Sequence, residues 1–534
     1  MVNACRSLPG AVMNSITIEN FRCFGEKQTA RLAPLTLLVG ENSTGKTSFL
    51  ALLRALDDFV QNDVPDFKRP PYDLGSFDEI AHYRGSRGGR AEKFSVEIAA
   101  LFLEDSLYRR RQKWLVTETY GQGPWRLYVQ FCKDIKGTAP IPTCLRISLS
   151  DKNKEDNTWI AFDYESPSVK VGTKRGTWNI SDRSLLQNKP MHFSERNMIS
   201  SLLEYDHLKA LRQAAISLSS NEKYSDVINM FEPEKDSLEI TKIDMQDLSS
   251  LNLGILEIIE IFRMEDVDTF PSVFPSAPVR SQPRRTYDPA RSHSDPEGNY
   301  VPMLLAELSS QQPDVWAHLK QRLEKFGQSS GLFDEIRIRH FGKIHSNPFQ
   351  VQVKKSGKRR QIKGPWRNLI DVGYGISQAL PIITELLLDD VEKLRDDTEQ
   401  ESLASLYQRQ CPYPRQFLLQ QPEVHLHPSA QAALGSLFCQ VAGPRRQLIV
   451  ETHSDHLMDR VRMDVRDGVS GLKPEDVSIL FFERRGLDVR IHSLRLDEQG
   501  NVLGAPDGYR QFFMDEMTRS LWPERSSEGS KVEA

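Results

Sequence analysis

The sequence lacks the features that mark several classes of protein. Its longest mostly apolar stretch, Leu251 to Phe262, is broken by two glutamates, an asparagine and a glycine, and is shorter than the ~18 residues that span a bilayer. No basic-then-apolar leader begins the chain. The 6 cysteines include no CxxC pair and follow no regular spacing, which argues against a zinc site and a disulfide framework. We expect a cytoplasmic protein with no membrane partner.

An excess of charge of one sign is also missing. Lys and Arg total 69 against 73 Asp and Glu, a formal net charge of -4, so the chain as a whole is not a general binder of polyanions. Its composition, 39% hydrophobic and 27% charged, is that of an ordinary globular protein and excludes wholesale disorder. A length of 534 residues predicts about two to four folding units.

The chain does contain a complete phosphate-binding loop. Residues 40–47 match the pattern GxxxxGK[ST], after an apolar run typical of a buried strand and before a helical stretch. The glycines let backbone N–H groups close around phosphate oxygens at the start of a helix. Lys46 is predicted to neutralise phosphate charge, and Thr47 to hold Mg²⁺. The residues predicted to bind the nucleotide here are Gly40, Glu41, Asn42, Ser43, Thr44, Gly45, Lys46, Thr47 and Ser48.

Three segments of the C-terminal half add to this motif. Residues 371–378 place two glycines and a serine at the start of an apolar helix, an arrangement that suits an anion. Residues 417–428 form an apolar strand that ends in polar side chains. Residues 448–454 form another strand, which runs into His453 at a helix start. Their order behind a full phosphate loop is not expected by chance.

The texture of the chain predicts its organisation. Alternating β-rich segments between 93 and 179 predict an antiparallel sheet. Beyond 300, helices and strands alternate as in a parallel sheet covered by helices. We predict an N-terminal extension, the first part of an ATPase core, an antiparallel β subdomain, a helical insertion, a linker, the second part of the core, and a C-terminal cap with a tail. These parts span residues 1–12, 13–92, 93–183, 184–267, 268–300, 301–484 and 485–534.

The motifs together resemble the ABC-type ATPase heads of the RecF, SMC and OLD-like group. The resemblance is strongest to bacterial AAA-family ATPases linked to anti-phage defence, of the Septu- or retron-associated kind. It covers residues 15–60 and roughly 271–520, including Ile18–Arg22, Ala277–Arg280 and Asp497–Trp522. It implies an α/β fold, namely an ABC-type P-loop ATPase head with an antiparallel β subdomain and a helical insertion.

The resemblance also implies a mechanism. Such heads pair head to tail around two ATP molecules, so we expect a homodimer or higher homo-oligomer with ATP and Mg²⁺ as cofactors. Gly375, Ser377 and Gln378 would then meet the γ-phosphate across the dimer, and His453 would sense it within its own subunit. The signature reads Gly-Tyr-Gly-Ile-Ser-Gln rather than Leu-Ser-Gly-Gly-Gln. Hydrolysis would control a separate effector protein, for which a nuclease is the expected type.

The end of the strand at 420–423 departs from the pattern of the family. Relatives place an acidic partner of Mg²⁺ there, whereas this chain has Gln420 and Gln421, and a glutamine cannot act as a general base. Three interpretations stay open: Gln420 replaces an original glutamate, Glu423 serves instead, or the protein is a naturally slow ATPase. We expect Mg-ATP binding with slow turnover. The candidate catalytic residues are Gln420, Gln421, Glu423 and His453, and the candidate metal ligands are Thr47 and Gln420.

Two basic runs leave contact with nucleic acid open. They are residues 109–113 and residues 354–360, the second extended by Lys363 and Arg367 and expected at a hairpin tip near Trp366. One alternative function is therefore a DNA-repair or chromosome-maintenance ATPase that acts directly on DNA. Another is an ATP-stabilised scaffold with little turnover, which the glutamine pair supports. No nuclease motif is evident in the sequence, so a cutting activity would belong to a different polypeptide.

Overall fold

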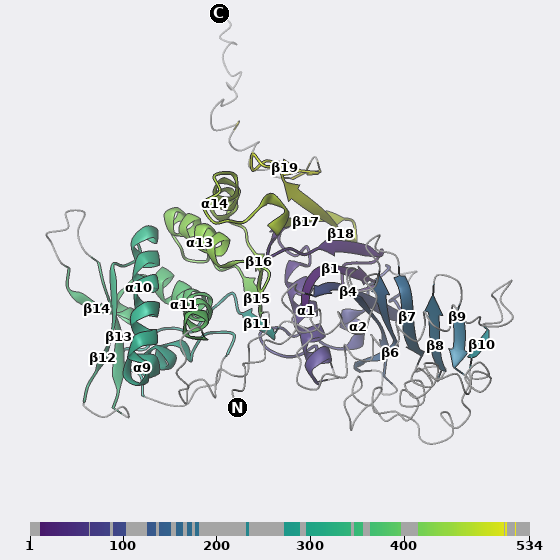
Figure 1. The fold of residues 1–534 in the computed structure, drawn as a ribbon, viewed down its shortest axis with the longest axis horizontal. Coiled ribbons are helices and arrows are strands. Elements are labelled where there is room, and N and C mark those ends of the chain that lie inside the picture. Colours follow the sequence, from purple (N-terminus) through teal and green to yellow (C-terminus); the bar gives the residue numbers. More distant parts are fainter. Residues whose placement is uncertain are drawn as a thin grey trace, which may run out of the picture.

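The described part of the chain, in a computed structural model, contains three sheets with helices packed between and around them (Figure 1). None of the described helices is long and apolar enough to cross a membrane. The residues that the structure describes are 11–62, 65–85, 89–102, 125–134, 138–150, 156–163, 168–173, 177–180, 231–233, 272–288, 295–342, 347–355, 364–396, 415–506, 508–509 and 518.

A seven-stranded sheet forms the centre of the molecule. Its strand order is β11-β15-β16-β3-β17-β18-β19, and the five strands from β11 to β17 run parallel. The strand that leads into the phosphate loop, β3, therefore lies in the middle, between β16 and β17. The bounds are β3 Leu35–Gly40, β11 Ser272–Ser276, β15 Arg415–Gln420, β16 Arg446–Glu451, β17 Val477–Arg485, β18 Asp488–Leu496 and β19 Val502–Leu503.

Both faces of this sheet are buried, which explains the continuous apolar runs in the sequence. Because side chains alternate between faces along a strand, Leu418, Ile449 and Leu480 face one core, while Leu419 and Val450 face the other. Helix α1 (Lys46–Asn62) packs in the first core. The same period of two puts the last residues of β15 and β16, at positions 420 and 451, on the α1 face.

The second core lies under a group of helices and a small sheet. Helices α10, α11, α13 and α14 pack on the face of the central sheet opposite α1, and the three-stranded sheet β12-β13-β14 lies beyond them (Figure 1). Gly331, with φ 73°, ends α10 in the left-handed conformation that glycine favours. The bounds are α9 Val301–Gln311, α10 Pro313–Ser330, β12 Glu335–His340, β13 Phe349–Lys354, β14 Trp366–Asn368, η1 Leu369–Asp371, α11 Tyr374–Asp396, α13 Pro428–Val441, α14 Asp455–Arg466 and η2 Pro474–Asp476.

A nine-stranded antiparallel sheet covers the other side of α1. Its order is β10-β9-β8-β7-β6-β5-β4-β1-β2. Aromatic side chains fill the space between this sheet and α1, with the rings of Phe59 and Phe131 at 6.2 Å and those of Phe94 and Phe131 at 4.9 Å. The bounds are β1 Ala11–Glu19, β2 Gln28–Arg31, β4 Lys93–Phe102, β5 Trp125–Lys133, β6 Pro140–Ser150, β7 Asp156–Asp163, β8 Ser168–Thr173, β9 Thr177–Ile180 and β10 Phe231–Pro233.

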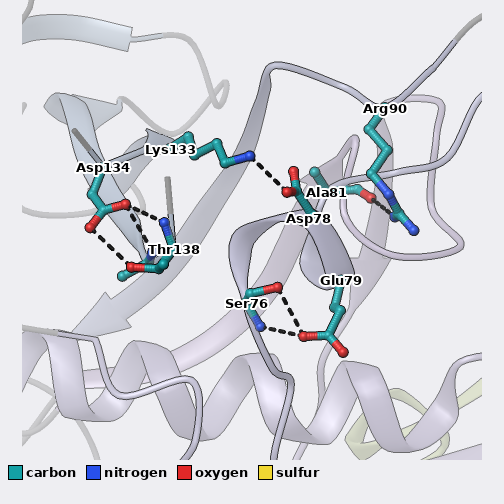
Figure 2. Close-up of polar contacts among 9 residues, drawn as sticks. Ser76, Asp78, Glu79, Ala81, Arg90, Lys133, Asp134 and Thr138 are labelled. Carbon is teal, nitrogen blue, oxygen red and sulfur yellow. Dashed lines mark hydrogen bonds and ion pairs between the residues drawn. The ribbon is translucent and has the colours of Figure 1, made fainter. Parts of the chain in front are cut away.

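A short helix, α2 (Phe77–Ile80), ties this sheet to the turn after β1. Figure 2 shows Glu79 accepting hydrogen bonds from Ser76 at the helix start, and Lys133 at the end of β5 paired with Asp78 at 2.7 Å. At its other end, the Ile80 carbonyl accepts the Arg22 N–H at 2.6 Å. The antiparallel sheet thereby helps to hold the turn that carries residue 22.

The antiparallel strands expected after 93 and the alternation of helices and strands expected after 300 are found in the described residues. The strands β12–β14 are a correction, because they form an antiparallel sheet of their own rather than part of the parallel sheet. The antiparallel sheet also recruits β1 and β2 from the N-terminal part. The stretch expected as a linker contains β11, an edge strand of the central sheet. The stretch expected as a cap contains β18 and β19, which extend the same sheet. Of the expected helical insertion the structure describes only β10, and the rest lies outside the described residues, as do residues 109–113.

Candidate functional site

The phosphate loop joins β3 to α1 and surrounds a pocket of about 470 Å³. Two of its glycines adopt backbone conformations that residues with a side chain rarely adopt, with φ +140° at Gly40 and +84° at Gly45. A Cβ on Gly45 would also lie 2.4 Å from the Cys23 sulfur. Loop residues 42–48 line the pocket, and the remaining lining residues are Arg22, Cys23, Gln421 and Glu451.

Lys46 supplies the positive charge of the pocket. Its side chain is almost fully buried, and its Nζ donates hydrogen bonds to the carbonyls of Gly40 at 3.0 Å and Glu41 at 2.6 Å. Burial lowers the pKa of Lys46, while the nearby carboxylates of Glu451 and Glu41 oppose that shift. A buried ammonium beside the first turn of a helix suits a polyanionic group such as a triphosphate.

Thr47, the next residue, lies between two side chains from the central sheet. Its hydroxyl lies 3.1 and 3.3 Å from the two carboxylate oxygens of Glu451, to which it donates. The Gln420 amide donates to the same hydroxyl oxygen at 3.0 Å. Gln420 and Glu451 are paired in the register of β15 and β16, so their side chains leave the sheet at the same level.

Glu451 was not among the predicted site residues. The signal was present, because it ends the apolar strand 446–450 as Gln420 ends its neighbour, but only His453 in that segment had been given a role. Burial raises the pKa of Glu451, and Lys46 and the Thr47 hydroxyl counteract the shift. Mg²⁺ is bound by oxygens, usually from one or two carboxylates together with phosphates and water. The Thr47 hydroxyl and the Glu451 carboxylate fit that requirement.

The other predicted catalytic residues occupy different places. Gln421 lines the pocket, in a left-handed conformation (φ 43°). Glu423 is only 7% exposed and accepts the backbone N–H of His453 at 2.7 Å. Burial is the largest influence on both groups: it raises the pKa of Glu423 and lowers that of His453, which favours the neutral imidazole. Of the pair Gln421 and Glu423, the glutamine therefore borders the space for a nucleotide.

Two further pocket residues, Arg22 and Cys23, come from the turn after β1. Arg22 belongs to the segment Ile18–Arg22 that carries the family resemblance, but no role was predicted for it. The imidazole of His82 holds this turn, with Nδ1 2.7 Å from the Arg22 carbonyl and Nε2 3.0 Å from Asp488. The Arg22 guanidinium donates to the Leu74 carbonyl at 2.8 Å. Burial raises the pKa of Cys23 to about 11, so its thiol is protonated at neutral pH.

The expected signature segment begins helix α11 and packs against the loop that follows β15. A Cβ on Gly375 would lie 2.7 Å from the His425 carbonyl oxygen, so this approach requires glycine. The Ser377 hydroxyl donates to the Tyr374 carbonyl at 2.8 Å. Neither Gly375 nor Ser377 lines the pocket of its own chain.

Gln378, also expected to meet the nucleotide, makes a different contact in this structure. It is 1% exposed, and its amide is bonded to the backbone N–H and carbonyl of Arg280 at 3.0 and 3.2 Å. The buried Arg280 guanidinium in turn donates to the Gln420 carbonyl at 3.1 Å. Gln378 thus connects the signature helix to the end of β15 through Arg280.

Strained backbone conformations are concentrated around the site. A positive φ in a residue other than glycine costs about 1–3 kcal/mol and persists where the surroundings enforce it. The described part of the chain has five such residues. Three line the pocket, one lies in the turn beside it and one packs against the signature helix; they are Arg22, Ser43, Gln421, Asn20 and His425.

Two family models match the chain. "AAA ATPase domain" matches residues 13–272, and "AAA domain, putative AbiEii toxin, Type IV TA system" matches residues 314–459. Each model describes a domain of the AAA type and is similar to one part of the chain. The first match contains the phosphate loop, and the second contains the start of α11, Gln420, Glu451 and His453, so residues of this site come from both matched stretches. No curated protein matches the chain.

Several solved structures are distantly similar to this chain. An SMC head bound to the C-terminal winged-helix domain of ScpA is 12% identical, with 91% of this chain and 98% of that chain covered and a TM-score of 0.38. A Pyrococcus furiosus SMC head with an extended coiled coil is 11% identical (91% and 96% covered, TM-score 0.36). The SMC head domain of Thermotoga maritima is 9% identical (90% and 98%, 0.32). The central sheet with its phosphate loop, rather than these weak superpositions, establishes the α/β fold.

Proposed function

We propose that this chain binds Mg-ATP at the phosphate loop and hydrolyses it slowly. The observation that carries the proposal is the arrangement of Lys46, Thr47 and Glu451, which provides a cation for phosphate and an oxygen pair for Mg²⁺. Bound Mg²⁺ would neutralise charge that develops on the phosphates. The protein's own contribution is to hold the triphosphate between the loop N–H groups and Lys46.

Slow turnover follows from which residues border the pocket. A general base must lie within hydrogen-bond reach of the attacking water, directly or through one water molecule. Among the described residues, Glu451 is the one carboxylate that lines the pocket, and it is bonded to Thr47. Gln421 can orient a water molecule but cannot accept its proton.

We further propose that ATP joins two copies of the chain. Gly375 and Ser377 of one copy would then complete the pocket of the other. This is supported by their position outside the pocket of their own chain and by the hydrogen bonds from Gln378 to Arg280 and on to Gln420. If the signature helix of one copy contacts the nucleotide bound by its partner, these hydrogen bonds connect that nucleotide to Gln420 in the helix's own copy.

The output would be control of a separate effector protein, such as a nuclease, in anti-phage defence. ATP would set which conformation of the dimer the effector meets. The description of the second family, which names a toxin of a toxin–antitoxin system, supports a two-component arrangement. The resemblance to defence ATPases supports the same role.

The molar mass of the chain in solution tests the assembly. We expect light scattering after gel filtration to show a monomer-to-dimer increase in mass with Mg²⁺ and a non-hydrolysable ATP analogue. Lys46→Ala should not show the increase. An unchanged mass, with the analogue demonstrably bound, would rule out dimerisation around ATP and leave nucleotide binding intact.

A second candidate, an ATPase that acts on DNA, is supported by the face of β12–β14 that points away from the helices. The guanidinium of Arg337 stacks on Trp366 at 4.2 Å, and Arg339 lies 5.7 Å from the Phe341 ring centre. Lys354 in this sheet is paired with Glu335, whereas most of the basic run after it lies outside the described residues. Salt-sensitive DNA binding that weakens on Arg339→Glu would favour this candidate, and its absence would remove it.

A further inference from the structure

We infer that Glu451, at the end of β16, is the carboxylate that binds the divalent cation in this ATPase, and that Gln420 at the end of β15 supports it as a neutral partner. The inference rests on the proposed binding of Mg-ATP. It places the acidic metal ligand at the end of β16 rather than β15, at a residue that was not among the predicted ligands.

The position of Glu451 follows from the sheet. Strand β16 lies directly beside β3, while β15 is one strand further away. Period-two alternation points residues 420 and 451 toward α1, where Thr47 is the second residue. An acidic residue at position 451 therefore reaches the same hydroxyl from the nearer strand.

Contacts with Thr47 distinguish the two side chains. The Thr47 hydroxyl donates its proton toward the Glu451 carboxylate and accepts a proton from the Gln420 amide. The Glu451 carboxylate, with its single negative charge, and the Thr47 oxygen would hold a cation at this point. Gln420 brings no charge, and its amide can present either its oxygen or its nitrogen.

Burial of Glu451 points the same way. Its side chain is 3% exposed, and removing a carboxylate from water is costly unless other charges compensate. Without nucleotide, the ammonium of Lys46 is the positive charge that offsets this cost. When ATP is bound, the same ammonium is also needed to neutralise the phosphates. A divalent cation would compensate Glu451 when Lys46 turns to the nucleotide.

The competing role for Glu451 is that of general base. A base has to face the water beyond the terminal phosphate, whereas both Glu451 oxygens lie against Thr47, the hydroxyl that the phosphate loop offers to a metal. The two roles make different predictions. Loss of a metal ligand weakens metal binding before any chemistry occurs, whereas loss of a base slows hydrolysis and leaves metal affinity unchanged.

Mn²⁺ titrations of the full chain, followed by electron paramagnetic resonance with a non-hydrolysable ATP analogue, test the inference. We expect Glu451→Gln to weaken Mn²⁺ binding about tenfold or more, while analogue binding in EDTA is kept because Lys46 is unchanged. The double variant Glu451→Gln with Gln420→Glu should recover part of the loss, since the two positions are register partners. Glu475→Gln, an exposed carboxylate remote from the pocket, is the control.

Each alternative result is informative. Unchanged Mn²⁺ affinity in Glu451→Gln, with slower hydrolysis, would overturn the inference and make Glu451 the base. A wild-type chain that binds no analogue in EDTA or with metal would instead overturn the proposed function on which the inference rests. If Glu451→Gln does not fold, Glu451→Asp, which shortens the side chain and keeps its charge, decides the question. Mn²⁺ affinity equal to wild type in that variant would contradict a direct ligand.

Discussion

Glu451 and Gln420 end neighbouring parallel strands in register, and both side chains contact the hydroxyl of Thr47. The carboxylate of the site, Glu451, therefore lies on β16, next to β3, whereas the sequence pattern led us to expect it at the end of β15, one strand further away. Metal binding, support of Thr47 and the positioning of water were all expected at residues 420–423, but the structure divides these roles among three residues. Glu451 is available for the metal, Gln420 for support of Thr47, and Gln421 for the space where water would attack.

The two glutamines should differ when each is replaced by glutamate. Gln421→Glu brings a carboxylate to the edge of the pocket, and a positioned base contributes about 100-fold or more to rate. Gln420→Glu instead adds a second negative charge beside Glu451. We expect steady-state phosphate release to rise strongly in Gln421→Glu and little in Gln420→Glu. A large increase in Gln420→Glu alone would show that position 420 is where an original glutamate acted.

Glu423 should make stability depend on pH. Burial raises the pKa of Glu423 in the folded chain, so the folded state binds this proton more readily than the unfolded state does. The contribution of Glu423 therefore becomes unfavourable as pH rises from its unfolded pKa, about 4.3, through its raised folded value. Glu423→Gln keeps an acceptor for the His453 N–H and cannot ionise.

We expect the Tm of Glu423→Gln to equal or exceed that of the wild type at about pH 8, with the gain lost toward about pH 4. Thermal unfolding across this range provides the check. A Tm below wild type at the alkaline end would mean that the ionised carboxylate stabilises the loop around His453.

Gly45 should tolerate no side chain. Gly45→Ala combines a φ of +84° with a Cβ 2.4 Å from the Cys23 sulfur. Gly471→Ala is a matched control, because its φ is +77° and nothing lies within 4 Å of the added atom. Backbone strain alone costs about 1–3 kcal/mol, so both variants lose stability.

We expect Gly45→Ala to lose more stability than Gly471→Ala and to lose ATP affinity as well, because the Cys23 side of the pocket must shift. Chemical denaturation and nucleotide titration measure the two effects separately. Equal losses in the two variants would mean that the contact between Gly45 and Cys23 does not constrain the loop.

The parts of the fold that could be predicted are those with a local signal. The phosphate loop, the strands around it and the helices after 300 follow from apolar periodicity and glycine placement. Strand β11 (Ser272–Ser276) was missed because it begins and ends with serine and contains Pro275, a composition typical of a loop. It is tolerated as a strand because it is the edge of the sheet.

The site was predictable to the same extent. The local sequence motif identifies Lys46 and Thr47 as nucleotide-site residues, but it cannot predict which strands lie next to one another in the sheet. Glu451 becomes relevant only when β16 lies between β3 and β15, which is a property of the sheet order. Similarly, Gln378 contacts Arg280, which lies 98 positions earlier in the chain, and no short pattern predicts such a partner.

The most direct test of the account measures Mg-ATP binding and steady-state hydrolysis side by side, for the wild-type chain and for Lys46→Ala. We predict saturable binding to the wild type with slow turnover, and affinity reduced about 10- to 100-fold in Lys46→Ala, since a charge-assisted contact contributes about 1.5–3 kcal/mol. Equal ATP affinity in the two proteins, or rapid hydrolysis by the wild type, would contradict it.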